Sequence, residues 1–263
     1  MNERTLSFEI DARRAERAWF ALGVRKSGSS IFSSIVNALA IFNEIHAVDI
    51  PGTLFAAGIR YVHWNSHPRI ADLLWRGNVY IGFRDPPTAF YADPVFREGK
   101  KILMVRDPRD ALVSEYFSNA FSHSLPTEQT GNTVLEQERA KALQSSLEAY
   151  VLERTEHLDL TVAGYRKLIG DPNLLILRYE DVIFDKARWI REIAGHFGWQ
   201  VSDELITNIL SWADVRPDAE NPQAFVRRVA PGDHLDKLSP GAIATVNGRL
   251  SDIWSEFGYA VGR

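Results

Sequence analysis

Short apolar runs alternate with helix-length amphipathic segments along this sequence, and this alternation limits the possible folds most. Three runs, Asn78–Phe83, Lys101–Val105 and Leu174–Arg178, are continuously apolar, which is typical of strands buried on both faces. Ala18–Val24 has the same character, and Tyr61–Trp64 is a weaker strand candidate. Because such strands separated by helices form parallel sheets, we predict an α/β fold with a parallel sheet flanked by helices.

Helical periodicity and capping signals fill most of the chain between these runs. The last helix, for example, has Ser239 as its N-cap and Pro240 at its first position. The predicted helices are Ser29–Ala40, Pro68–Trp75, Asp110–Ser122, Val134–Thr155, His157–Ile169, Asp185–Gly198, Asp203–Ala213 and Pro240–Phe257. Two long segments, Leu125–Thr133 and Val215–Leu238, lack a periodic pattern, and we expect functional loops there.

Length and composition fit a single domain over residues 1–263. The net charge of −4 gives no overall attraction to nucleic acid, so an anion site must be local. Cysteine is absent, which excludes thiolate catalysis and cysteine-ligated zinc. No run approaches the roughly 20 apolar residues of a membrane span, and Met1–Arg17 does not resemble a signal peptide. We therefore expect a cytoplasmic protein.

The turn after the first strand has the composition of a phosphate site, and we call it the first clamp. It consists of Arg25, Lys26, Ser27, Gly28, Ser29 and Ser30. The helix that follows presents free N–H groups and the positive end of its dipole, while Gly28 permits close approach and Lys26 adds a cation. An ordinary serine-capped turn is the alternative. The order of lysine and glycine differs from the triphosphate loop GxxxxGK[ST].

A second strand runs into a helix over Lys101–Ser114, and its end forms the second clamp, Arg106–Ser114. Arg106 leaves the strand at its carboxyl end, where open α/β sheets bind ligands. Ser114 lies one helical turn after Asp110, and an arginine with a hydroxyl is a good phosphate receptor. The alternative is that Arg106 pairs with Asp107 or Asp110.

Four segments, taken in order, resemble the motifs of sulfotransferases that use 3′-phosphoadenosine 5′-phosphosulfate (PAPS). The first clamp is similar to the family's PKSGTTW, and the second matches R-[NDA]-x-[KR]-D-x-x-x-S throughout. Tyr179-Glu180-Asp181 matches a YED element, followed by the family's xxFLG-like end at Ala194–Gly198. Phe225–Asp233 is similar to F-x-R-[KR]-G-x-x-G-D. The resemblance spans most of the chain and implies a P-loop-like core.

The same resemblance implies a role for each matching residue. Lys26 would act catalytically on the 5′-phosphosulfate, which the rest of the first clamp would cradle. Arg106 and Ser114 would hold the 3′-phosphate, with Arg227 and Arg228 closing over it. Tyr179 would contact the adenine, and Trp212 would stack on it unless it belongs to the core. The product would be adenosine 3′,5′-bisphosphate, and the chemistry requires no metal.

The general base is where this sequence departs from the family. The KTHLP-like segment corresponds to Gly82–Pro86, which places Arg84 where a histidine is expected, and arginine does not act readily as a base. Asp85 is the nearest carboxylate and our candidate base, unless it is only a turn residue before two prolines. The alternatives are Glu44, His46, Asp49, His63 and His67.

These observations predict a PAPS-dependent sulfotransferase acting on a hydroxyl or amine of a small molecule or glycan. A PAPS-binding protein that has lost its base is the first alternative, because the histidine and its companion lysine are both replaced, the latter by Gly82. A small-molecule kinase is the second. The oligomeric state is left open, because the family's short C-terminal dimer motif is not recognisable.

Overall fold

The computed structural model describes residues 7–11, 17–122 and 129–260, with the side chains of 129–134 left out. Its centre is a five-stranded sheet of order β2-β3-β1-β4-β5 in which every pair is parallel. The strands are β1 (Trp19–Gly23), β2 (His46–Val48), β3 (Asn78–Phe83), β4 (Lys100–Val105) and β5 (Leu174–Arg178). The predicted parallel α/β fold is confirmed.

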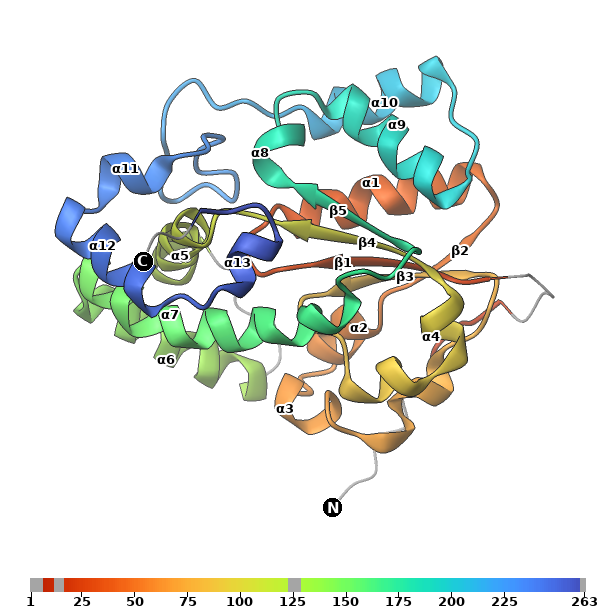
Figure 1. The fold of residues 1–263 in the computed structure, drawn as a ribbon, viewed down its shortest axis with the longest axis horizontal. Coiled ribbons are helices and arrows are strands. Elements are labelled where there is room, and N and C mark those ends of the chain that lie inside the picture. The colour runs from red at the N-terminus through yellow and green to blue at the C-terminus, as the bar shows by residue number, and fades with distance from the viewer. Residues whose placement is uncertain (1–6, 12–16, 123–128, 261–263) are drawn as a thin grey trace.

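Helices cover both faces of this sheet (Figure 1). On one face lie α1 (Ser29–Phe42), α8 (Tyr179–Val182), α9 (Lys186–Phe197) and α10 (Asp203–Ala213). The other face packs against α2 (Ile50–Ala56), α3 (Tyr61–Trp64), α4 (Pro94–Glu98), α5 (Pro108–Phe117), α7 (Leu147–Ala163), α12 (Pro240–Arg249) and α13 (Ile253–Glu256). Each face has its own cluster of buried apolar side chains, so the sheet is buried on both sides.

The remaining elements are short helical turns and one long helix. They are η1 (Pro68–Leu73), η2 (Thr88–Ala92), η3 (Ser118–Ser122), α6 (Gln129–Gln144), η4 (Gly164–Leu168) and α11 (Asp233–Lys237). Among the described residues, no helix is both long and apolar enough to cross a membrane.

Several local predictions were wrong. Tyr61–Trp64 is helix α3 rather than a strand, and the three-residue strand β2 was not expected. The single helix predicted over Val134–Thr155 is broken between α6 and α7, because Ser146 accepts a hydrogen bond from the Ala149 N–H and starts a new helix. The predicted helix over His157–Ile169 is the second half of α7 followed by η4.

Other boundaries also shift. The helix predicted over Pro240–Phe257 is divided into α12 and α13. Of the segment expected to be irregular, Gln129–Thr133 belongs to α6, and residues 125–128 lie outside the described part. Val215–Leu238 is irregular as expected except for α11.

All five strands point the same way, so their carboxyl ends meet at one edge of the sheet. In Figure 1 the arrows point towards the side where α5, α11 and α12 lie. The first clamp follows β1 and the second follows β4, which is the neighbour of β1. The topology therefore brings the two clamps side by side.

Candidate functional site

The first clamp is a tight turn whose backbone is opened towards the helix that follows it. Lys26 and Gly28 both have positive φ, at 63° and 78°, and Gly28 is the N-cap of α1. No side chain caps α1, so the N–H groups of its first turn remain available to an anion. A Cβ on Gly28 would lie 3.0 Å from the Tyr179 ring, so only glycine fits there.

The serines of the first clamp have different positions. Ser27 is fully buried, and both its N–H and its hydroxyl donate to the Val24 carbonyl, at 3.2 and 2.7 Å. Ser27 therefore shapes the turn from within. Ser29 is buried at the start of α1, whereas Ser30 is exposed.

Four cations act on one another at this edge of the sheet. Burial lowers the pKa of Lys26 to about 8, and the positive charges of Arg25, Arg106 and Arg84 contribute to the same decrease. The negative charge of Glu115 opposes this decrease. Positive charge held together in a buried place is unfavourable, so a bound anion would relieve the repulsion.

The second clamp begins with Arg106, which is buried beneath the first. Its Nη1 donates to the Lys26 carbonyl at 3.3 Å, and its guanidinium lies 4.4 Å from the Tyr179 ring centre. Within the described part of the chain its buried Nε has no hydrogen-bond partner. An arginine that is buried with an unused donor is suited to a phosphate oxygen.

The distances show whether Arg106 pairs with Asp107 or with Asp110. Asp107 caps α5 and pairs with Arg109 at 2.5 Å, so it is not the partner of Arg106. Arg106 Nη2 lies 3.8 Å from Asp110 Oδ2, which is a loose ion pair. Ser114 is half-buried one turn further along α5.

Asp110 connects the second clamp to the segment before α11. Its carboxylate accepts the N–H of Gly232 at 2.7 Å, and the N–H and Nδ1 of His234 at 2.9 and 2.7 Å. These bonds contribute to holding the pKa of Asp110 below its ordinary value. Asp110 is therefore kept as a carboxylate that fixes this segment against α5.

Arg227 and Arg228 lie on the segment that Asp110 holds. Arg227 pairs with Glu220 and Asp233, and its guanidinium lies 4.2 Å from the Phe117 ring centre of α5. Arg228 pairs with the same Asp233 at 2.9 Å. Both arginines thus have carboxylate partners. Burial raises the pKa of Tyr179, and the positive charges of Arg106 and Arg227 partly oppose this increase.

The two aromatic candidates differ in exposure. Tyr179 is buried against Gly28 and Arg106, so its ring supports both clamps. Trp212, near the end of α10, is 41% exposed and is therefore not a core residue. The structure therefore leaves the Trp212 indole accessible to a nucleotide base.

The candidate base Asp85 lies at the carboxyl end of β3 among tyrosines. Its carboxylate accepts a hydrogen bond from the Tyr61 hydroxyl, and Tyr91 is close enough to be affected by its charge. Burial raises the pKa of Asp85, an effect only partly offset by the bond from Tyr61. A carboxyl group with a raised pKa is a better proton acceptor than an exposed aspartate.

Of the other base candidates, Asp49 lies at the carboxyl end of β2, at the same edge as the clamps. It follows β2, caps α2 through the Gly52 N–H at 2.8 Å, and acts electrostatically on Arg84. Burial raises its pKa as well. His63 is exposed, and His67 caps η1 through the Arg69 N–H at 3.2 Å.

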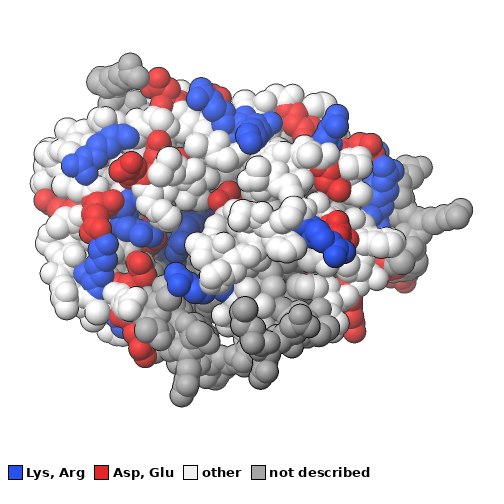
Figure 2. Space-filling model, turned by 90° about the horizontal axis from the view of Figure 1, so that it is seen from below, with Lys and Arg blue, Asp and Glu red and all other residues white. Residues whose placement is uncertain are grey.

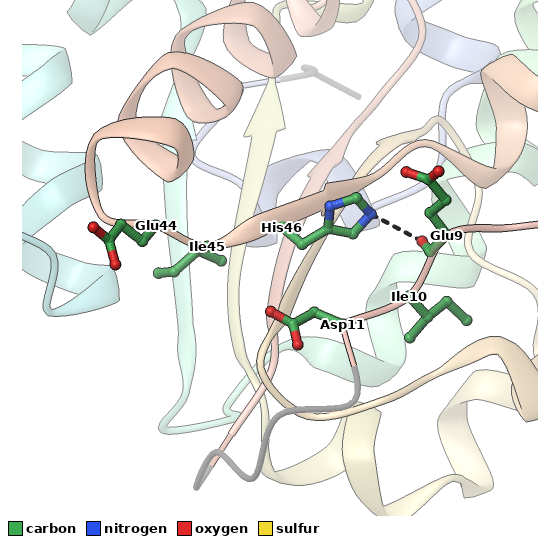
Figure 3. Close-up of a pocket in the computed structure, with 6 residues that line it drawn as sticks. All are labelled: Glu9, Ile10, Asp11, Glu44, Ile45 and His46. Carbon is green, nitrogen blue, oxygen red and sulfur yellow. Dashed lines mark hydrogen bonds between the residues drawn. The ribbon is translucent and has the colours of Figure 1, made fainter.

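Glu44 and His46 lie at the opposite end of the strands. His46 begins β2 and is paired with Asn78, the first residue of β3. Figure 3 shows the side chains of Glu44 and His46 lining a pocket together with Glu9 and Asp11. The pocket has a volume of about 460 Å³, and a hydrogen bond of 2.9 Å joins His46 to the Glu9 carbonyl. Neither residue can reach the clamps.

Figure 2 shows lysine and arginine atoms gathered in and around a recess on one face, with acidic atoms at its rim. The recess lies in the left half of that view, on the side towards which the strands of Figure 1 point. The described residues contain no group of three or more metal-ligating side chains. What the two clamps present is cations and helix N–H groups, which are groups that bind anions.

Sequence reasoning missed the residues that support this site from a distance. Glu115 is a buried carboxylate whose Oε1 lies 2.8 Å from Arg154 Nη2 and 3.5 Å from Arg25 Nη2. It directly follows Ser114, and an acidic residue inside an otherwise apolar helix face was the only local signal. Tyr61 and His234 gave none, because their partners are distant in sequence.

Comparison with known proteins gives consistent results. The family model described as "Sulfotransferase domain" matches residues 17–226, which is most of the chain. Mouse sulfotransferase SULT7A1, solved with PAP, shares 15% identity over 95% of this chain and 90% of its own, with a TM-score of 0.59. Retinol dehydratase, solved with retinol and PAP, shares 15% over 96% and 85%, with a TM-score of 0.51. No curated protein has a significant sequence match to this chain.

Proposed function

Since the chain belongs to the family of PAPS-dependent sulfotransferases, we propose that its two clamps hold the two ends of PAPS. The observation that carries this proposal is the convergence of Lys26 and Arg106 on adjacent strand ends, one beside uncapped helix N–H groups and the other with an unused buried donor. Two separate anion receptors in contact fit a nucleotide with phosphates at two positions.

The first clamp would hold the 5′-phosphosulfate. PAPS supplies the sulfuryl group. The bond between its sulfur and the phosphate oxygen breaks, with the electron pair remaining on that oxygen, as a bond forms between the sulfur and the acceptor oxygen or nitrogen. The N–H groups at the start of α1 and the Lys26 ammonium stabilise negative charge that develops on the leaving oxygen. Because charge stabilisation and positioning dominate such transfers, a lysine can serve where phosphoryl transfer uses a metal.

The second clamp would hold the 3′-phosphate. Arg106 offers its Nε, which has no partner among the described residues, and Ser114 offers a hydroxyl from α5. Arg227 and Arg228 lie on the segment fixed by Asp110 and would close over the same group. Tyr179 and Trp212 would contact the adenine, the first from within the clamps and the second from its exposed position on α10.

Asp85 would accept the proton of the acceptor, because its carboxylate lies at the correct edge and its pKa is raised. One observation favours Asp49 as a second candidate. Asp49 acts on Arg84, which in turn acts on Lys26, whereas Asp85 is not among the groups that perturb the pKa of either cation.

Matched variants separate these two carboxylates. Asp85→Asn and Asp49→Asn each preserve shape and hydrogen-bonding capacity while removing the basic oxygen. If Asp85 is the base, Asp85→Asn reduces the rate constant of transfer roughly 10²–10⁴-fold and leaves nucleotide affinity intact. A fully active Asp85→Asn together with an inactive Asp49→Asn would transfer the role to Asp49.

Transfer of label from [³⁵S]PAPS tests the proposed function itself. We expect label to pass to acceptors in a metabolite extract without magnesium, and Lys26→Ala to abolish the transfer. Magnesium-dependent binding of ATP in place of adenosine 3′,5′-bisphosphate would favour a small-molecule kinase. Tight binding of the bisphosphate without any transfer would favour a nucleotide-binding protein that has lost catalysis.

The acceptor and the location complete the proposal. The aromatic residues near Asp85, among them Tyr61 and Tyr91, support a small molecule or glycan that presents a ring next to its hydroxyl or amine. A cytoplasmic location is proposed with it, and fractionation of cells that express the protein would test that location.

A further inference from the structure

Arg84 occupies the position of the missing histidine, and its direction is set by an irregularity in β3. The pairing of β1 with β3 runs Trp19 to Val79 and Phe20 to Tyr80, but then Leu22 to Phe83. One extra residue is therefore accommodated in β3 before Phe83. Such bulges change the direction of the side chains that follow them.

The extra residue can be followed in the burial pattern. Tyr80 belongs to the core beneath α2 and α3, and Ile81 to the core beneath α1, as alternation requires. Regular alternation would place Phe83 on the α1 side, but it packs with Tyr80 in the other core. Arg84 directly follows Phe83, so the shift also changes how the chain leaves β3 at Arg84.

Only glycine can occupy the bulge. Gly82 has a φ of +87°, and a Cβ there would lie 2.3 Å from Asp49 Oδ1. Asp49 thus fills the space beside Gly82 where the family's lysine side chain would start.

Arg84 directly follows β3, which is the neighbour of β1, so it lies at the strand end beside the first clamp. It affects the pKa of Lys26, and it is itself affected by Arg25 and by Tyr165, whose hydroxyl donates to the Gly23 carbonyl at the end of β1 at 3.2 Å. Its Nη1 donates to the Gly82 carbonyl at 3.1 Å, and within the described part of the chain its other donors have no partner.

Within the described residues, Arg84 forms no ion pair, in contrast to Arg106, Arg227 and Arg228. Burial lowers the pKa of Arg84, so its charge is held at a cost in this environment. Since Arg84 remains protonated, it cannot act as the histidine would. A group that is permanently charged, half-buried and without an ion-pair partner among the described residues is suited to bind an anion.

We propose that Arg84 is a catalytic residue that binds the oxygens of the transferring sulfuryl group. This inference rests on the proposed function. Arg84 would orient the group for in-line transfer and withdraw negative charge from its oxygens, while Lys26 stabilises the leaving oxygen. The proton is then left to a carboxylate, so this chain divides between two residues what a histidine-based site combines.

Binding of PAPS and of adenosine 3′,5′-bisphosphate without acceptor tests this role, because the two nucleotides differ only in the sulfuryl group. Arg84→Gln should weaken PAPS binding roughly tenfold or more and change the affinity for the bisphosphate less than twofold. Arg84→Lys should restore part of the affinity for PAPS. Arg191→Gln is the control. It removes a half-exposed arginine of α9 that pairs with Asp203, and it should leave the affinity for both nucleotides unchanged.

The outcomes separate the two proposals. If the wild-type protein binds neither nucleotide, the proposed function fails and this inference fails with it. Suppose that the wild type binds both nucleotides, and that Arg84→Gln lowers the two affinities equally or not at all. Arg84 then does not contact the sulfuryl group, and only this inference fails. Should Arg84→Gln not fold, the same ratio of affinities measured for Arg84→Lys decides the question.

Discussion

The pH dependence of nucleotide binding tests the electrostatics of Lys26. Burial and three neighbouring arginines lower the pKa of Lys26 from 10.5 to about 8. A bound phosphate favours the charged ammonium, so binding must raise this pKa and take up a proton. Affinity is therefore full below pH 8, and it declines as the pH rises from 8 towards the higher pKa of the complex.

The size of this effect follows from the pKa. Suppose that the nucleotide restores the pKa of Lys26 to 10.5. The binding free energy then weakens by about 3.4 kcal/mol in total between low and high pH, since one pKa unit corresponds to about 1.36 kcal/mol. Between pH 7 and pH 9 the loss is about tenfold, and at pH 8 about half a proton is taken up per nucleotide. Titration calorimetry of adenosine 3′,5′-bisphosphate in buffers of different ionisation enthalpy measures both quantities.

Lys26→Arg is the matched control, because arginine keeps its charge throughout this range. The tenfold decline and the proton uptake should both disappear in that variant. A wild-type affinity that is constant from pH 7 to pH 9 would refute the argument. So would an equal decline in Lys26→Arg, because another group would then be responsible.

Three further substitutions test other parts of the site. Arg106→Ala should weaken binding of the bisphosphate by about 1.5–3 kcal/mol in calorimetry but leave the affinity for adenosine 5′-phosphosulfate unchanged; an equal loss for both would contradict the assignment of the second clamp. Gly82→Ala should lower the free energy of unfolding by at least about 1–2 kcal/mol in urea titrations, because a Cβ there collides with Asp49, and an unchanged midpoint would exclude the bulge. Trp212→Ala should cost about 1–3 kcal/mol of nucleotide affinity without changing Tm, since the indole is 41% exposed; a lower Tm with intact affinity would make it structural.

The four long strands were predictable because their signal is local. Each is a continuous apolar run within one or two residues of the observed strand, and burial on both faces leaves few other interpretations. β2 was missed because it has only three residues and is stabilised by pairing with β3. The strand predicted at Tyr61–Trp64 was wrong because a run of four residues is too short to show whether its period is that of a strand or of a helical turn.

The sequence by itself determined the fold class and the place of each proposed clamp at a strand end. Each clamp is one contiguous strand–turn–helix, so its residues and its position at the strand end are properties of neighbouring amino acids. Their adjacency follows only from the strand order, which places β1 beside β4.

Only the tertiary structure decided what surrounds the clamps. The direction of Arg84 depends on a bulge defined by pairing with β1, and the environment of Asp85 depends on Tyr61, 24 residues away. The fixed position of Arg227 depends on Asp110, more than a hundred residues earlier in the chain. These contacts join residues with no local relation, so their geometry and electrostatics exist only once the sheet has assembled. The residues proposed to bind PAPS lie in contiguous motifs, whereas the surroundings of the candidate base depend on such distant contacts.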